Sequence, residues 1–323
     1  MRRLLALTMP LALVVLVVVS LTRFMRFEAR EIILIAAFSP YALIGYVLLL
    51  LGFLVAARRN RRRPLLLLGA VASMVGILAH VSWLSPLFFA DEDDRTGRPD
   101  LTVLTANLDG GQADALTPVS AVRDHDVDLV VLVEVTPSTL DRLLARGLGD
   151  LLPYHRGAPS QTDQGTMVFS RFPLGQAKSL SLSKGGLDLR VLAAHPFRLL
   201  VVHTSQPVKH ASTWVKDLVA VRAAAASSIG GGDTVVAGDF NATRDHRQFR
   251  AVLGLGLRDA AEQSGAGWQP TWPTRDWKAW LRPLVTIDHV LTSDAYVARR
   301  TYTVEPEDTD HLALIAELDR RHG

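Results

Sequence analysis

The sequence of 323 residues contains no cysteine. Disulfides, thiolate metal sites and a cysteine nucleophile are therefore excluded. It also lacks a G-x-S-x-G stretch, so a covalent acyl mechanism through a serine has little support. No glycine-rich nucleotide loop, internal repeat or low-complexity run is present either. Candidate chemistry therefore rests on carboxylates, amides and histidines.

The net charge differs between the two parts of the chain. Residues 1–100 hold 12 arginines, no lysine and 7 acidic residues, which gives this third a formal charge of +5. The remaining residues carry a formal charge of −2, although the whole chain has +3. The C-terminal part therefore lacks the basic surplus that is typical of a surface gripping nucleic-acid phosphates.

Three long apolar runs dominate the N-terminal third, at Leu4–Leu21, Ile32–Ala57 and Leu65–Phe89. Each is close to the ~20 residues that cross the ~30 Å hydrocarbon core of a bilayer. The first run is not followed by an A-x-A-like cleavage site, which disfavours a removed signal peptide. We predict a membrane region with three transmembrane helices over 1–90, an acidic linker over 91–100 and a catalytic domain over 101–323.

The arginines predict how the chain is oriented. Five of them lie in "ARRNRRRP" (57–64), between the second and third runs, and two more at positions 2 and 3. Loops rich in arginine stay in the cytoplasm. A cytoplasmic N-terminus and three spans place the catalytic domain outside the cytoplasm, in a multi-pass protein of the cell membrane. His80, inside the third run, is interpreted as bonded to a neighbouring helix rather than as functional.

From residue 101 onward the pattern changes to short strands rich in β-branched residues, several apolar on both faces. Helical segments fall between them, which predicts α/β layering with two packed sheets or helix-covered sheets. The predicted strands cover 101–108, 128–135, 165–170, 197–204, 234–240, 287–293 and 312–318, and the predicted helices lie around 119–125, 136–146 and 212–228.

Polar side chains gather at the ends of these strands, where layered folds place their functional residues. Carboxylate and amide oxygens suit Mg²⁺, whereas structural zinc needs a closed set of histidines or cysteines. Histidines add groups that transfer protons near neutral pH. A metal, an acid–base pair and groups that bind anionic oxygens are together what the attack of water on a phosphate ester or anhydride requires. The residues are Asn107, Glu134, His203, Asp239, Asn241, Asp288, Asp310 and His311.

Seven ordered stretches carry a family resemblance. They are "TANLDGG" (105–111), "LVEV" (132–135), "GTMVFSRFPL" (165–174), "HTSQP" (203–207), "GDFNAT" (238–243), "TIDHVL" (286–291) and "TDHLAL" (309–314). In this order over residues 101–318, the chain resembles the endonuclease/exonuclease/phosphatase superfamily, which includes sphingomyelinases and inositol polyphosphate 5-phosphatases. The resemblance implies a four-layered α/β sandwich, with two facing sheets flanked by helices.

The resemblance also implies a role for each matching residue. Glu134 would hold Mg²⁺, or Mn²⁺ in its place, with help from Asn107 and Asp310. Asp239 would orient or deprotonate the attacking water, and Asn241 would bond phosphoryl oxygens. Asp288 would orient His311, which would contact the phosphate or act as the base, and His203 would donate to the phosphate or leaving group. Asp239 and His311 both stay candidates for the base.

Two positions depart from the family pattern, and three polar residues are assigned no role. Thr286 stands where many relatives have arginine, and His289 where nucleases more often carry tyrosine. His289, His195 and Asp128 are interpreted as structural or of unknown role.

Three substrate classes compete. The chain resembles a membrane-anchored actinobacterial branch that includes a glycopeptide-resistance protein of the teicoplanin and vancomycin clusters, thought to act on undecaprenyl pyrophosphate. This favours a membrane lipid or lipid-linked phosphate as the partner, and the tryptophans of segment 267–285 would suit a lipid interface. A surface nuclease is disfavoured by the charge of the domain. A phospholipid phosphodiesterase of the sphingomyelinase kind is the third class. No obligate protein partner is inferred.

Overall fold

The computed structural model describes residues 2–26, 28–58, 63–90, 97–274 and 283–321. Contacts within the chain divide it into two compact units. The first comprises residues 1–86 with the short segment 245–247, and the second comprises the remaining residues. Most of the predicted acidic linker, residues 91–96, lies outside the described residues, as do Trp277 and Trp280 of the tryptophan-rich segment.

The first unit is helical. It contains α1 (Arg2–Thr22), α2 (Arg30–Ala37), η1 (Ser39–Tyr41), α3 (Ala42–Ala57), α4 (Arg63–Leu84) and η2 (Ser85–Leu87). Within the described residues, two helical stretches are long and apolar enough to cross a membrane, Ser39–Ala57 and Pro64–Leu87. The described apolar part of α1, Thr8–Thr22, is shorter. The expectation of three such helices is therefore met for two.

The second predicted run, Ile32–Ala57, is not one continuous helix. Helix α2 ends at Ala37, and the chain turns through η1 before α3 begins at Ala42. Pro40 lies within η1, where its ring fixes φ and it supplies no N–H to a continuing helix. An apolar run indicates hydrophobicity but does not show where a helix breaks. The prediction from the sequence therefore treated α2 and α3 as one helix.

Helices α3 and α4 pack closely because glycines of α4 face aromatic rings of α3. A Cβ on Gly69 would lie 2.6 Å from the ring of Phe53, and one on Gly76 would lie 2.5 Å from the ring of Tyr46. Small residues of this kind let helices approach in a bilayer, where burial of apolar surface supplies no driving force. The ring of His80 lies against Tyr46, and its Nε2 is 2.9 Å from a hydroxyl of α1.

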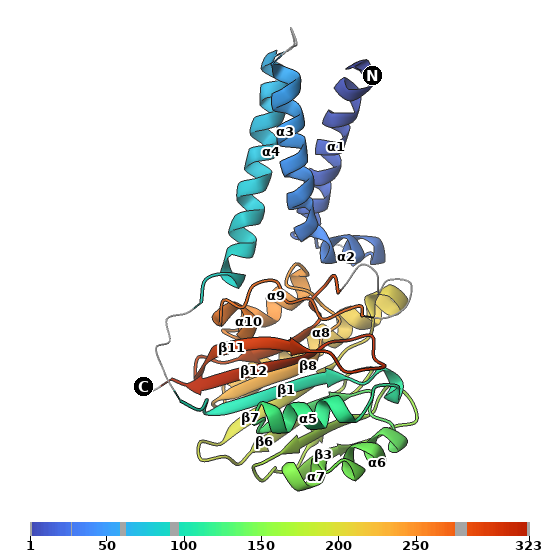
Figure 1. The fold of residues 1–323 in the computed structure, drawn as a ribbon, viewed down its shortest axis with the longest axis vertical. Coiled ribbons are helices and arrows are strands. Elements are labelled where there is room, and N and C mark those ends of the chain that lie inside the picture. Colours follow the sequence, from blue (N-terminus) through green and yellow to red (C-terminus); the bar gives the residue numbers. More distant parts are fainter. Residues whose placement is uncertain (1, 27, 59–62, 91–96, 275–282, 322–323) are drawn as a thin grey trace. The chain divides into compact units, whose positions relative to one another are not determined.

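The second unit holds two six-stranded sheets (Figure 1). In the first sheet the strand order is β11-β12-β1-β2-β4-β3, and in the second it is β5-β6-β7-β8-β10-β9. The strands of the first sheet are β1 (Leu101–Asn107), β2 (Leu129–Val133), β3 (Tyr154–Ala158), β4 (Thr166–Ser170), β11 (Tyr296–Val304) and β12 (Ala313–Arg320). Those of the second are β5 (Lys178–Ser179), β6 (Gly186–Val191), β7 (Phe197–His203), β8 (Thr234–Asp239), β9 (Arg258–Asp259) and β10 (Asp288–Thr292).

Alternation along the central strands builds two hydrophobic layers. In β1, Val103 joins the cluster between the sheets, whereas Leu104 joins the cluster beneath the helices of the first sheet. In β2, Val131 and Leu132 divide in the same way. Strands buried on both faces read as continuous apolar runs. The covering elements are η3 (Asp109–Gly111), α5 (Leu116–Asp124), α6 (Pro137–Ala145) and α7 (Leu148–Leu151) on one side, and α8 (Pro207–Ile229), α9 (Arg247–Leu253) and α10 (Ala260–Gln263) on the other.

This arrangement confirms the predicted sandwich of two sheets flanked by helices, and each of the seven predicted strands lies on an observed one. The sequence missed five others: β3, β5, β6, β9 and β11. They are short, or mix charged and glycine residues with apolar ones; β3, for example, reads "YHRGA" and is exposed throughout. Four of the five, all but β6, are the outermost strands of their sheets. An edge strand is less buried, so its sequence needs no regular pattern of apolar residues.

Candidate active site

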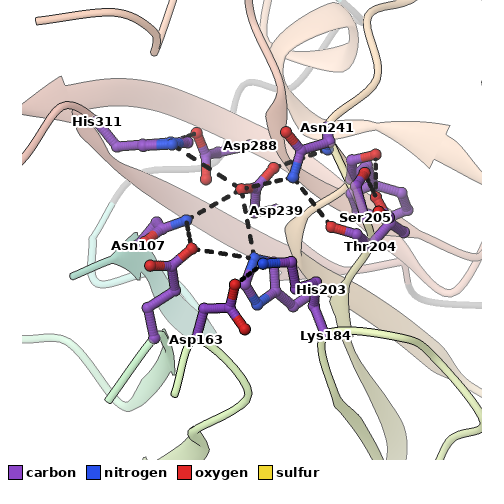
Figure 2. A network of polar contacts seen from close by, with 12 residues as sticks. Asn107, Asp163, Lys184, His203, Thr204, Ser205, Asp239, Asn241, Asp288 and His311 are labelled. Atoms are coloured by element: carbon purple, nitrogen blue, oxygen red, sulfur yellow. Dashed lines mark hydrogen bonds and ion pairs between the residues drawn. The ribbon is translucent and has the colours of Figure 1, made fainter. Parts of the chain in front are cut away.

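One row of residues crosses the second sheet and defines the centre of the site. His203 ends β7 beside Asp239 at the end of the parallel strand β8, and Asp239 is in register with Asp288, the first residue of antiparallel β10. All three side chains are buried. The carboxyl ends of two strands and the start of a third therefore place a histidine and two carboxylates next to one another (Figure 2).

The first sheet contributes Asn107 and Glu134 from the ends of its own parallel pair. Asn107 ends β1, and Glu134 follows β2 with φ at +60°. A left-handed backbone at a glutamate is strained by about 1–2 kcal/mol, which surrounding contacts must offset. One such contact is the backbone N–H of Gly110, which donates to Glu134 Oε2 at 2.7 Å. The strained turn directs this carboxylate into the site.

A single amide joins the two sheets. Asn107 Nδ2 donates to Asp239 Oδ2 at 3.1 Å and lies 3.4 Å from Glu134 Oε1, while Asn107 Oδ1 accepts the backbone N–H of Asp109. With this orientation, Asn107 bridges two carboxylates as a donor (Figure 2).

The turn after β8 brings Asp239 and Asn241, two residues apart in the sequence, into direct contact. The backbone N–H of Asn241 donates to Asp239 Oδ1 at 2.7 Å, and its Nδ2 lies 3.2 Å from Asp239 Oδ2 and 3.1 Å from the Thr204 carbonyl oxygen. Asn241 has φ at +47°, a conformation that asparagine tolerates better than most residues. Gly238 precedes the turn with φ at +141°, and a Cβ there would lie 2.0 Å from the Val202 carbonyl oxygen.

Asp288 and His311 form a buried pair on the far side of Asp239. His311 Nδ1 is 2.9 Å from Asp288 Oδ2, and its Nε2 is 3.9 Å from Asp239 Oδ2. Asp310 Oδ1 lies 3.7 Å from the same Nε2, while Asp310 Oδ2 accepts the indole N–H of Trp272 at 2.8 Å. Three carboxylates therefore surround one imidazole.

These charges move the pKa values apart. Burial, followed by the charge of Asp288, raises the pKa of Asp239 to about 7. For His311, burial lowers the pKa but is outweighed by Asp288, Asp239 and Asp310, so that the pKa rises to about 10. At neutral pH His311 is therefore an imidazolium, whereas Asp239 titrates near the working range of a general base.

His203 is the opposite case. It is fully buried, and within the described residues neither ring nitrogen has a hydrogen-bond partner. Burial, then the charges of Lys184 and His311, lowers its pKa to about 3. Its Nε2 lies 3.5 Å from Glu134 Oε1 and 3.9 Å from Asp239 Oδ2. A neutral imidazole with unpaired nitrogens faces the site and can contact a ligand.

Comparison with known proteins identifies the family to which the chain belongs. The sequence model of the endonuclease/exonuclease/phosphatase family matches residues 104–311, which is most of the second unit. The chain belongs to this family. Its members are metal-dependent hydrolases of phosphoester bonds, and the protein is accordingly a phosphohydrolase. No curated protein matches the chain by sequence.

Solved structures of this family share the fold at low identity. TDP2 from D. rerio, complexed with a single-stranded DNA product, has a TM-score of 0.55 and 17% identity, over 68% of this chain and 98% of that one. Sphingomyelinase C from Streptomyces griseocarneus has a TM-score of 0.52 and 17% identity, over 68% and 99%. A mannosyl-6-phosphatase from Bacteroides thetaiotaomicron gives the same four values. The three names span different substrates, so the fold does not select one.

The site fits the divalent metal of this family. Burial raises the pKa of both Glu134 and Asp239, and the two carboxylates approach the same amide nitrogen of Asn107. Like charges held this close favour a cation between them. Oxygen ligands of this kind suit Mg²⁺ and Mn²⁺. A second cluster, Asp239, Asp288 and His311, has ligand atoms within 4.8 Å of one another, and the hydrogen bond between His311 Nδ1 and Asp288 Oδ2 occupies one ligand atom of each of these two residues.

Of the predicted site residues, seven lie in one network and one lies beside it. Asn107, Glu134, His203, Asp239, Asn241, Asp288 and His311 are linked by the contacts above. Asp310 contacts His311 and Trp272, and no contact among the described residues joins it to Glu134 or Asn107. The role of Asp310 at the metal stays a prediction.

Two of the three polar residues without an assigned role have structural partners. His289 lies between Asp259 Oδ2, at 2.7 Å, and the Ala242 carbonyl oxygen, at 2.9 Å. Asp128 is buried against two arginines, and His195 is exposed. Sequence reasoning missed Lys184 and Asp163, which border the site in Figure 2. They come from loops outside the predicted strands, so no strand-end pattern marked them.

Proposed function

We propose that the protein is a membrane-anchored phosphatase that hydrolyses a lipid-linked pyrophosphate, such as undecaprenyl pyrophosphate, outside the cytoplasm. The observation that carries this proposal is a phosphohydrolase site on a chain that reaches it directly from an apolar helix, α4. Residues 88–100 separate the end of η2 from β1, and they extend at most ~45 Å. The site would therefore work close to a bilayer surface.

The exposed surfaces of α3 and α4 support membrane anchoring. Leu48 and Val55 of α3 are each 64% exposed, and Leu65 and Leu68 of α4 are 67% and 65% exposed. A core helix of a soluble protein buries such side chains, whereas lipid tails accept them. We extend the proposal to α1 as a third span, since its described apolar part is contiguous with further apolar residues of the same helix.

Helix α4 by itself orients the catalytic unit. Its first residue, Arg63, ends the arginine cluster of residues 58–63, and positive loops remain cytoplasmic. A helix that starts inside ends outside, so the second unit would lie outside the cytoplasm whether or not α1 also spans. A third span would then put the N-terminus, with Arg2 and Arg3, in the cytoplasm.

The geometry favours Asp239 over His311 as the general base. A base must accept a proton, and His311 already carries two because Asp288 stabilises the imidazolium. Asp239, with a pKa near 7, takes the proton of the attacking water at Oδ2. Glu134, with Asn107 nearby, would hold the metal, which when bound supplies positive charge to the phosphoryl oxygens.

The other side chains bind the phosphoryl group. The Nε2–H of His311 donates to an oxygen whose negative charge grows in the transition state, and Asn241 bonds a second oxygen. His203, neutral and unpaired, donates to the leaving oxygen. Its position near Glu134 and Lys184 puts the leaving group on that side of the site.

Charge and location favour a lipid pyrophosphate over nucleic acid. The chain after residue 100 has a formal charge of −2, and a nuclease would instead need cations along the substrate backbone. Trp268, 37% exposed, stands at the start of the tryptophan-rich segment that would suit a lipid interface.

Phosphate release tests the proposal. The full-length protein, in detergent with Mg²⁺, is given farnesyl diphosphate, sphingomyelin or single-stranded DNA, with Asp239→Asn as the control. Inorganic phosphate is measured for the first substrate, phosphocholine for the second and strand shortening for the third. We expect release from farnesyl diphosphate that the substitution abolishes. Turnover of only sphingomyelin or DNA would reject the lipid pyrophosphate and retain the phosphohydrolase.

Topology requires a separate measurement. Alkaline phosphatase, fused after Gly323, is active only outside the cytoplasm, and a matching green fluorescent protein fusion folds inside. We expect an active phosphatase fusion. Fluorescence from the second fusion with an inactive first would reverse the proposed orientation.

A further inference from the structure

A lysine outside the predicted motifs borders the site, held by loops from both sheets. Lys184 lies just before β6 of the second sheet, and its ammonium pairs with Asp163, in the loop between β3 and β4 of the first (Figure 2). Gln164 Nε2 donates to the Ser183 carbonyl oxygen at 3.1 Å, and the Ser183 N–H donates to buried Asp217 at 3.0 Å. The loop that carries Lys184 is thereby anchored to the β3–β4 loop of the first sheet and to helix α8.

The environment of Lys184 is costly for a free ammonium. Its side chain is 17% exposed, and burial lowers its pKa, while the charges of Glu134 and Asp239 raise it and the nearby Lys209 lowers it. The charge of Lys184 also lowers the pKa of His203. Lys184 is therefore close enough to the reacting groups for its charge to affect them.

The ion pair alone does not account for this arrangement. Asp163 is 43% exposed, and a half-exposed lysine–aspartate pair contributes little to stability. Two lysines near one site also repel each other unless an anion lies between them. Lys184 and His311 flank the buried carboxylates from opposite sides in Figure 2, so an anion beside Lys184 would be distinct from one bound at His311.

We propose that Lys184 binds the second phosphate of a diphosphate substrate, the one that departs, after leaving Asp163. This inference rests on the proposed function and names what selects a diphosphate over a monophosphate. The water oxygen bonds to the terminal phosphorus as its bond to the bridging oxygen breaks, and Asp239 takes the water proton. The products are inorganic phosphate and the lipid monophosphate, whose new negative oxygen Lys184 and His203 face.

Two substrates with the same lipid tail, one with a diphosphate and one with a monophosphate, show the effect of the second phosphate alone. Farnesyl diphosphate and farnesyl monophosphate are compared as a ratio of kcat/KM, in full-length protein with Mg²⁺. We expect Lys184→Met to lower this ratio at least tenfold and Lys184→Arg to keep it within about threefold. Asp163→Asn, which frees the ammonium, should raise kcat/KM for the diphosphate. Lys178→Met is the matched control, because Lys178 is exposed on edge strand β5.

The outcomes distinguish phosphate binding by Lys184 from a purely structural ion pair with Asp163. A structural ion pair predicts that Lys184→Met and Asp163→Asn act in the same direction and leave the ratio unchanged, which would overturn the inference. Thermal unfolding of each variant separates loss of folding from loss of selectivity, and Asp163→Asn keeps the test valid if the methionine variant unfolds. If the wild type does not hydrolyse the diphosphate, the proposed function fails before any variant is compared.

Discussion

Replacing Asp239 with asparagine should make the metal-free protein more stable and the enzyme inactive. Burial and Asp288 raise the pKa of this carboxyl from 3.8 to about 7. Three units at ~1.4 kcal/mol each disfavour the ionised form by about 4 kcal/mol above pH 7. In the variant, the amide oxygen still accepts the bond from the Asn241 N–H. Its NH₂ group replaces Oδ2 and cannot accept the bonds from the side-chain NH₂ groups of Asn107 and Asn241, at a cost of ~1 kcal/mol for each lost bond. The net gain is about 2 kcal/mol.

The sign depends on pH. A raised pKa stabilises the fold below pH 3.8, and this stabilisation is lost as the pH rises towards 7 because the buried group must ionise. The asparagine variant has no such loss. At pH 8 in EDTA its thermal unfolding should therefore lie about 4–8 °C above that of the wild type, and at pH 5 most of the difference should vanish. Phosphate release should fall about 10²–10⁴-fold, the usual contribution of a general base.

Calorimetry of the full-length protein and phosphate assays in Mg²⁺ measure both effects on one preparation. Added Mg²⁺ should remove the advantage of the variant, since a cation compensates the wild-type carboxylate. A variant that melts below the wild type at pH 8 in EDTA would refute the electrostatic reasoning. A variant that retains a tenth of the activity would refute the role of Asp239 as the base.

Two further substitutions test single contacts. Asp288→Asn removes the carboxylate that most raises the pKa of His311, so the alkaline limb of kcat/KM should move from about 10 towards 6.5, and an unmoved limb would separate the two residues functionally. Gly238→Ala places a Cβ 2.0 Å from the Val202 carbonyl oxygen, and denaturant unfolding should show a loss of about 3 kcal/mol or more. Gly232→Ala has a similar φ of +132° with nothing within 4 Å, so it should cost only ~1–2 kcal/mol; equal losses would rule out the backbone clash.

Buried strands were predictable from the sequence because burial on both faces leaves a continuous apolar run. β2 and β8 show this most clearly, with every residue buried. Edge strands such as β3 were not predictable, because an exposed strand needs no such pattern. The break between α2 and α3 was also missed, since hydropathy does not record where a helix turns.

The candidate site divides in a similar way. The polar residues at strand ends were identifiable because a carboxylate directly after an apolar run has few structural reasons to be there. Their partners were not, because a hydrogen bond such as that of Asn107 with Asp239 joins residues 132 positions apart. Lys184 was missed because a lysine in a loop is unremarkable until the fold brings Asp163 and Glu134 to it.

By itself, the sequence determined the family, the order of the motifs, the apolar runs and the chemical types at the site, because each is a property of local composition. Only the tertiary structure decided the register that aligns His203, Asp239 and Asp288, the contact of Asp310 with Trp272 and the neighbourhood of Lys184. Those depend on pairing between distant strands, and the free energy of pairing is set by packing across the whole sheet rather than by any one segment.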